Sequence, residues 1–175
     1  MNKTILILLG SVRPGNYTVQ ASNALAACLR THGADVHLID PATLTLADPG
    51  HPPTPDTTAL QAQVTAADAL VIATPEYHGS YSSVTKRTIE NLGFPSTLAN
   101  KPIALLGVAA GVIGAIKSLE HLRSVCAHVG AHVLPTVVSL AKVHTLFDDQ
   151  GNCTDEPTIK RLDAHAQALL DHISA

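Results

Sequence analysis

The feature that most constrains this chain is a set of apolar runs, each followed by a loop of small and polar residues. The first run is Ile5–Leu9, which leads into the loop Gly10–Thr18, and similar runs stand at Ala69–Thr74 and Pro102–Val108. Near-continuous apolar runs are typical of strands buried on both faces, as in parallel sheets covered by helices. Segments with helical periodicity follow these runs, so strand and helix alternate along the chain.

This alternation occurs five times and predicts a doubly wound α/β fold, in which a parallel sheet carries helices on both faces. Pro75 is expected to end the third strand, and Pro135 inside the fifth predicts that this strand lies at an edge. At this length we expect residues 1–175 to form a single domain. The predicted strands are Thr4–Leu9, Asp35–Ile39, Ala69–Thr74, Pro102–Val108 and His132–Leu140, and the predicted helices are Tyr17–Thr31, Thr57–Ala67, Ser83–Leu92, a long helix ending near Val129, and Glu156–Ile173.

Charge and apolar patterning argue against several classes of protein. The formal net charge is −3, without the basic stripe of a nucleic-acid binder. No apolar run approaches the roughly 20 residues of a membrane span, and Met1–Lys3 leads into a strand rather than a signal peptide. Cys28, Cys126 and Cys153 lack the number and spacing of a disulfide framework or a zinc site. We therefore expect a cytoplasmic protein without nucleic-acid or membrane partners.

Three loops of unusual composition follow the first, third and fourth predicted strands. They are Gly10–Thr18, Pro75–Ser82 and Ala109–Gly114. Ligands of open parallel sheets bind beyond the carboxyl ends of the strands, where the strand order reverses. The sequence therefore predicts that these loops converge on one site.

The first loop is rich in groups that bind phosphate. Ser11, Asn16 and Thr18 add donors, Arg13 adds a fixed charge, and the helix start adds free N–H groups. Neither the P-loop pattern nor the Gly-x-Gly-x-x-Gly pattern is present. Such a loop can also serve only to turn the chain and cap a helix. Arg13 favours a phosphate monoester, because a turn needs no guanidinium.

The second loop combines an aromatic ring with ionisable groups. Tyr77 offers a flat surface to a planar ligand, although it could also be a hydrophobic plug. Glu76 and His78 could perform acid–base work. Alternatively, His78 is a solvated turn residue and Glu76 is a helix cap or an ion-pair partner.

The third loop, Ala109–Gly114, has no acid, base or nucleophile and offers backbone contacts and space. Together the three loops supply phosphate donors, a flat apolar surface and backbone N–H groups. They supply no catalytic triad, because Ser11 has no evident base, and no metal site is expected. The chemistry is therefore assigned to a bound cofactor rather than to catalytic side chains.

Two motifs carry a family resemblance. The pattern Gly10-Ser11-x-Arg13 with Asn16 and Thr18, followed by Pro75-Glu76-Tyr77-x-Gly79-Ser80, resembles the NADPH-dependent FMN reductase family of flavodoxin-like proteins. The segments His121–Val125 and Gly130–Val133 also resemble that family's fourth helix and fifth strand. The similarity runs from about Lys3 to the last helix.

The resemblance implies a flavodoxin-like sheet in the order 2-1-3-4-5, bound FMN, hydride transfer from NADPH or NADH to the flavin, and a homodimer or homotetramer. It implies phosphate contacts from Ser11, Arg13, Asn16, Tyr17 and Thr18, and ring contacts from Pro75, Glu76, Tyr77, His78, Gly79, Ser80, Ala110 and Gly111. The chain departs from the family in two places. His78 stands where members often have Asn, and Ala109-Ala110 stands where many have Ser or Gly.

The expected function is therefore an FMN-dependent NAD(P)H oxidoreductase with a small-molecule acceptor, which could be a quinone, an azo compound, a metal oxyanion or free flavin. The first alternative is a flavodoxin-type electron carrier without its own substrate. Such carriers are usually strongly acidic, so the small net charge and Arg13 argue against it. The second is a nucleotide hydrolase or transferase, for which only Glu76 could serve as the carboxylate.

Overall fold

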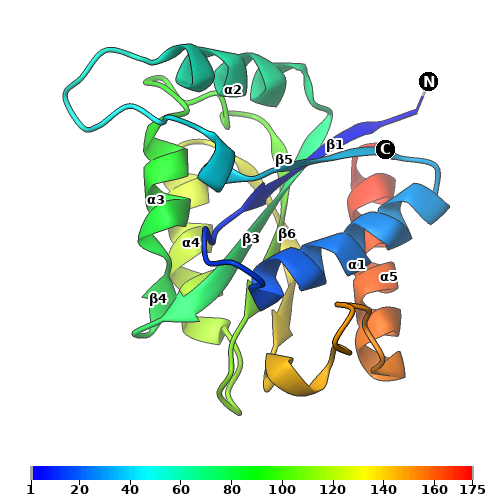
Figure 1. The fold of residues 1–175 in the computed structure, drawn as a ribbon. Helices are drawn as coiled ribbons and strands as arrows, with labels where there is room; N and C mark the ends of the chain where they lie inside the picture. The colour runs from blue at the N-terminus through cyan, green and yellow to red at the C-terminus, as the bar shows by residue number, and fades with distance from the viewer. Residues whose placement is uncertain (1, 175) are drawn as a thin grey trace.

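A sheet of parallel strands forms the centre of the molecule, with helices on both faces (Figure 1). The structure is a computed structural model that describes residues 2–174, so residues 1 and 175 of the predicted domain lie outside it. The parallel strands lie in the order β2-β1-β3-β5-β6, and the short β4 pairs antiparallel with β3. Counted along the chain without β4, this is the predicted order 2-1-3-4-5, which is confirmed. The strands are β1 (Thr4–Leu9), β2 (Asp35–Ile39), β3 (Ala69–Tyr77), β4 (Ser80–Tyr81), β5 (Pro102–Val108) and β6 (His132–Leu140).

The helices divide between the two faces of the sheet. Helices α1 (Tyr17–Thr31) and α5 (Glu156–His172) cover one face, and α2 (Pro55–Ala66), α3 (Ser83–Glu90) and α4 (Ile116–His128) cover the other (Figure 1). Two 3₁₀ turns, η1 (Pro41–Thr43) and η2 (Val143–Thr145), lie in connections. The predicted helices are confirmed to within about two residues at the ends that were predicted.

The alternation of side chains in β1 explains why its apolar run is continuous. Ile5, Ile7 and Leu9 belong to the core beneath α1 and α5. Leu6 and Leu8 belong to the core beneath the other helices. Because both faces of β1 are covered, every position from Ile5 to Leu9 is buried and apolar.

The first helix begins and ends at residues that the sequence indicates. The Asn16 side chain accepts a hydrogen bond from the Val19 N–H over 3.0 Å and so caps the N-terminus. Gly33, with a φ of 86°, follows the last turn. The Asn16 cap fixes the start of α1 directly after the loop that follows β1, and Gly33 marks its end.

The expectation that Pro75 ends the third strand is wrong. Strand β3 continues to Tyr77, and Glu76 and Tyr77 pair with Tyr81 and Ser80 of β4. His78 and Gly79 make the turn with φ values of 51° and 76°. Two residues with positive φ form the turn that best fits the twist of a hairpin, and His tolerates this conformation better than most residues. This hairpin overrides the breaking effect of Pro75.

Strand β6 lies at the edge of the sheet, as its internal proline predicts. The pairing register between β5 and β6 shifts between Ile103 and Leu105, opposite the part of β6 that contains Pro135. An irregular edge strand can tolerate a residue that lacks an N–H donor. Within residues 2–174, no helix is long and apolar enough to cross a membrane.

Candidate functional site

A cavity of about 390 Å³ opens beyond the carboxyl ends of the central strands. It lies where the chain order reverses between β1 and β3, the usual ligand position in such sheets. Its volume lies within the roughly 300–1,000 Å³ typical of small-molecule sites. The residues that line it are Arg13, Pro14, Gly15, Asn16, Tyr17, Thr18, Pro75, Glu76, Tyr77, Val108, Ala109, Ala110 and Val143.

The first loop is shaped by its own side chains. The Ser11 hydroxyl accepts a hydrogen bond from the Arg13 N–H over 3.3 Å, and the Asn16 amide donates to the Arg13 carbonyl. Ser11 is buried and does not line the cavity. Ser11 and Asn16 therefore do the turn-making and capping work that was the alternative to direct phosphate contact.

Other donors in this loop have no protein partner. Within residues 2–174, the backbone N–H groups of Tyr17 and Thr18 meet no acceptor, as expected for the first turn of a helix. The exposed Arg13 guanidinium makes no hydrogen bond or ion pair with any described residue. A helix N-terminus with free N–H groups beside an unpaired guanidinium suits a terminal phosphate.

Only some of the ring-contact residues predicted in the second loop line the cavity. Pro75, Glu76 and Tyr77 line it, and the Tyr77 side chain is 39% exposed. His78 and Gly79 form the hairpin turn and do not line the cavity. Histidine is among the residues that tolerate a positive φ, and this explains the presence of His78 in the turn without a role in catalysis.

Two polar side chains of this loop are bound to α4. The Glu76 carboxylate accepts a hydrogen bond from the Ser118 N–H over 3.2 Å, so it caps a helix, as one alternative held. The Ser80 hydroxyl lies 3.1 Å from Nδ1 of His121, outside the cavity. In the structure both side chains therefore link this loop to α4, Glu76 through one carboxylate oxygen and Ser80 through its hydroxyl.

The structure brings most of the predicted contacts together and leaves the rest outside. Those that line the cavity are Arg13, Asn16, Tyr17, Thr18, Pro75, Glu76, Tyr77 and Ala110, and those that do not are Ser11, His78, Gly79, Ser80 and Gly111.

Sequence reasoning missed the wall contributed by the connection between β6 and α5. Val143 lines the cavity, and its N–H donates to the Ala109 carbonyl over 3.1 Å. The neighbouring Lys142 N–H donates to the Gly111 carbonyl over 3.1 Å. The segment between β6 and α5 is rich in polar residues, and Val143, Leu146 and Phe147 are the apolar signal within it.

No side chain in the cavity is arranged as a nucleophile with its base. Elsewhere, burial raises the pKa of the Cys126 thiol to about 12 and also raises the pKa of Cys28. Both thiols are therefore protonated and unreactive at neutral pH.

Across residues 2–174, no group of three or more His, Cys, Asp or Glu side chains could hold a metal ion. The cavity supplies a binding site, and a bound cofactor must supply the chemistry.

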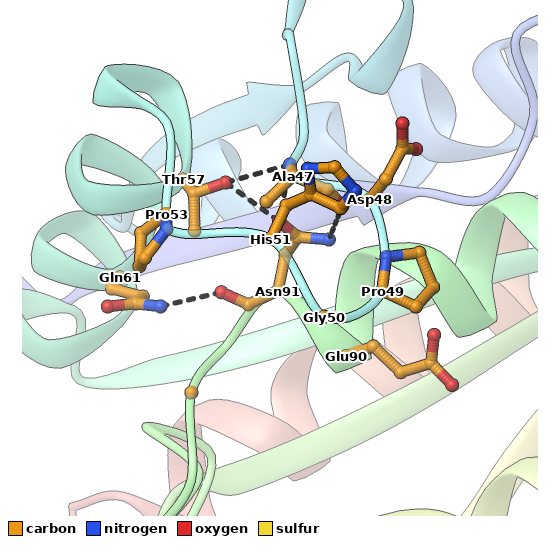
Figure 2. Close-up of a pocket in the computed structure, with 11 residues that line it drawn as sticks. Ala47, Asp48, Pro49, Gly50, His51, Pro53, Thr57, Gln61, Glu90 and Asn91 are labelled. Carbon is orange, nitrogen blue, oxygen red and sulfur yellow. Dashed lines mark hydrogen bonds between the residues drawn. The ribbon is translucent and has the colours of Figure 1, made fainter.

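A smaller cavity of about 170 Å³ lies under the loop that follows η1, where it is lined by Asp48, His51 and Gln61 among others (Figure 2). Its polar centre is the buried Asn91, which bonds to Ala47 and Thr57. Every polar atom of the Asn91 side chain has a protein partner. This network fastens the loop to the end of α3 and offers a ligand no free group.

Comparisons of the sequence and the fold with known proteins point to one family. Residues 3–145 match the family described as NADPH-dependent FMN reductase. An NAD(P)H-dependent FMN reductase of Pseudomonas aeruginosa is 31% identical over 173 residues, covering 94% of this chain and 92% of the relative. An FMN-dependent NADPH-azoreductase of Staphylococcus haemolyticus is 31% identical over 142 residues, or 77% of this chain and 74% of the relative. The structure of FerB, an NAD(P)H:(acceptor) oxidoreductase from Paracoccus denitrificans, has a TM-score of 0.85 at 25% identity and covers 98% of this chain and 97% of that one.

Proposed function

Because this chain belongs to the NADPH-dependent FMN reductase family, we propose that the 390 Å³ cavity is the site at which it holds FMN. The protein is an oxidoreductase that uses FMN and NAD(P)H. The observation that carries the assignment of the site is the unpaired donor set of the first loop. Arg13, whose guanidinium is unpaired, and Tyr17 and Thr18, whose N–H groups are free, all line the cavity.

The residues of the cavity fit both ends of FMN. The donors of Arg13, Tyr17 and Thr18 suit the phosphate dianion. Apolar atoms of Tyr77, Val108 and Val143 suit a planar ring. The lining therefore combines phosphate donors with apolar surface, the two kinds of group that an FMN molecule presents for binding.

The chain's own contribution is binding, orientation and exclusion of water. When bound, FMN supplies the redox chemistry, accepting a hydride from NAD(P)H and passing electrons to an acceptor. The first loop would anchor the phosphate, and the apolar residues Tyr77, Val108 and Val143 would help to exclude water from the ring. Backbone N–H groups of the second and third loops would stabilise negative charge at the ring.

We propose a planar, largely apolar small molecule, such as a quinone or an azo compound, as the electron acceptor. Tyr77 lines the site and is 39% exposed, and Val112 and Ile113, in the loop that contributes Ala110 to the cavity wall, are 72% and 75% exposed. The relatives named as an azoreductase and as an NAD(P)H:(acceptor) oxidoreductase support this class. Metal oxyanions and free flavin are the competing acceptors.

The test starts from the absorption spectrum of the purified protein and titrations with FMN and riboflavin. We expect a yellow protein or tight FMN binding, weaker riboflavin binding, and steady-state NAD(P)H oxidation with quinone or azo acceptors. Equal affinity for FMN and riboflavin would contradict the proposal that the first loop binds the phosphate of FMN. FMN binding without NAD(P)H oxidation would favour an electron carrier instead.

We also propose that the chain forms a homodimer or homotetramer. Phe94 is fully exposed and lies beside a groove of about 780 Å³ between the end of α3 and α4. A large exposed ring next to a groove is typical of an interaction surface. Light scattering at micromolar concentration should give a multiple of the chain mass, and Phe94→Glu should lower it if this surface is used.

The domain organisation and location are proposed on simpler grounds. All described strands belong to connected sheets, which supports one cooperative domain over residues 1–175. One unfolding transition, coincident by circular dichroism and fluorescence, would agree with this. Three free cysteines support a reducing cytoplasm, and cell fractionation tests that location.

A further inference from the structure

The start of α4 differs from that of every other α-helix in the described chain. Helices α1, α2, α3 and α5 are each capped by the side chain just before them, which accepts a hydrogen bond from the third helical N–H. The corresponding residue of α4 is Ala115, which has no side-chain acceptor. Helix α4 must therefore obtain its N-terminal partners from elsewhere.

Two strands supply the missing acceptors. The Glu76 carboxylate, at the end of β3, accepts from the N–H of Ser118, the third residue of α4, over 3.2 Å. The Ser139 hydroxyl, in β6, accepts from the Ala115 N–H over 2.8 Å. Glu76 thus occupies the capping position that local side chains fill in the other helices. Its negative charge also faces the positive end of the helix dipole.

This capped helix start holds the end of the third loop. A Cβ atom added to Gly107 would lie 2.6 Å from the Ala115 side chain, and one added to Gly114 would lie 2.4 Å from the Ser139 hydroxyl. There is no spare room between β5, β6 and the first turn of α4. The position of Ala109 and Ala110 in the cavity wall therefore depends on where α4 begins.

Glu76 also lines the cavity, next to Tyr77. We propose that Glu76 is a positioning residue of the flavin site: by capping α4 from β3, it holds the Tyr77 wall and the Ala109–Ala110 wall at a set separation. This inference rests on the proposed FMN site. It assigns Glu76 a task other than acid–base catalysis, namely to hold the start of α4 through the oxygen that accepts the Ser118 N–H.

The experiment compares Glu76→Ala with Glu76→Gln and with the control Glu120→Ala, which removes an exposed carboxylate from the same helix. FMN and riboflavin are titrated separately, and amide hydrogen exchange of residues 109–118 is followed in the flavin-free protein. Riboflavin lacks the phosphate, so it reports on the ring site alone. Glutamine keeps an oxygen acceptor at the same position.

Glu76→Ala should lower the affinities for FMN and for riboflavin by the same factor. The expected loss is about tenfold, which corresponds to one hydrogen bond to a charged group. Amide exchange in residues 109–118 should accelerate. Glu76→Gln should largely restore both properties, and Glu120→Ala should match the unmodified protein. Should Glu76→Ala not fold, Ser139→Ala removes the other acceptor and carries the same expectation for both flavins.

Unchanged flavin affinities, with or without a lower melting temperature, would mean that Glu76 only stabilises the fold. A loss of affinity for FMN alone would mean that Glu76 acts on the phosphate end of the site. Either result overturns the proposal. If the unmodified protein binds neither flavin, the proposed FMN site fails. The exchange data on flavin-free protein would still report whether Glu76 holds the third loop.

Discussion

The ring of Tyr17, the first residue of α1, lies 6.3 Å from the ring of Phe147, with 35° between the two planes. Phe147 belongs to the connection between β6 and α5, more than a hundred residues further along the chain. Tyr17 also lines the proposed flavin cavity, as does Val143 of the same connection. This aromatic pair therefore joins the phosphate loop to the cavity wall that sequence reasoning missed.

Phe147→Ala should lower the free energy of unfolding and weaken FMN binding. A fully buried Phe→Ala change costs about 3–5 kcal/mol, and Phe147 is only partly buried, so about half of that is expected. Urea unfolding gives the stability, and flavin fluorescence gives the affinity. Phe147→Leu, which keeps most of the apolar volume, should lose less of both. Unaltered FMN affinity in Phe147→Ala would separate this connection from the site.

Arg13→Ala should weaken FMN binding and leave the flavin-free protein as stable as before. The side chain is exposed and pairs with no described residue, so its loss should change stability by no more than about 0.5 kcal/mol. A charge-assisted hydrogen bond contributes roughly 1.5–3 kcal/mol, or about 10- to 150-fold in affinity. Solvent screening favours the lower half of that range.

Riboflavin affinity should be unaffected in Arg13→Ala, and the loss for FMN should shrink as salt is raised. Lys160→Ala, which removes a positive charge from the exposed face of α5, is the matched control and should change neither affinity. A lower melting temperature of the flavin-free protein with normal FMN affinity would instead make Arg13 a structural residue of the loop.

Asn91→Leu should destabilise the fold without affecting flavin binding. The buried Asn91 side chain accepts from the Ala47 N–H over 2.9 Å and from the Thr57 hydroxyl over 2.7 Å, and it donates to the Ala47 and Arg87 carbonyls. Leaving several buried groups unpaired should cost about 3 kcal/mol or more.

The comparison for Asn91→Leu is Gln61→Ala, which removes one hydrogen bond to the Asn91 carbonyl (Figure 2) and should cost about 1 kcal/mol. Chemical denaturation measures both variants. A specific loss of NAD(P)H oxidation in folded Asn91→Leu protein would give the small cavity a role in turnover that its satisfied network does not suggest.

The stability of the protein should fall as the pH drops below about 6.5, in part because of His165. This side chain is 4% exposed, and burial lowers its pKa, an effect partly offset by a hydrogen bond to the backbone of Leu105. The folded state therefore keeps His165 neutral while the unfolded chain takes up a proton. The resulting stabilisation is complete above the unfolded pKa and is lost as the pH falls through the window below it.

His165→Leu should reduce this slope of stability against pH between 6.5 and 5. One proton can contribute at most about 1.4 kcal/mol per pH unit. His172→Gln, which changes an exposed histidine on the same helix, is the control and should leave the slope as it is. An unchanged slope in His165→Leu would assign the pH dependence to other groups.

Local patterns in the sequence determined the architecture. The apolar runs at Ile5–Leu9 and Ala69–Thr74 specify strands buried on both faces, because only a sheet covered on both sides can bury every residue of such a run. Asn16 and Gly33 mark the ends of α1 through short-range hydrogen bonding and backbone conformation. Such signals depend on neighbours within a few residues, so they can be read from the sequence alone.

The residues that meet in the cavity were only partly predictable. The convergence of the three loops follows from parallel topology, which places the carboxyl ends of all the strands at one edge. The positions of Val143 and Phe147 do not follow from it, because the path of a long connection depends on packing against distant elements. Their contacts with Ala109 and Tyr17 span more than thirty residues of chain.

Tertiary structure alone decided the tasks of Glu76 and His78. In the sequence, Glu76 is equally compatible with catalysis, capping and ion pairing. The absence of a local cap at Ala115 places the third N–H of α4 within its reach, and that contact selects capping. In the sequence His78 is compatible with a ring contact and with a turn residue, and the antiparallel pairing of β3 with β4 places it in the turn with a positive φ. Sequence determined which chemical groups are present near the site, and long-range pairing decided which of them are free to meet a ligand, because a polar group already hydrogen-bonded to the fold is no longer available.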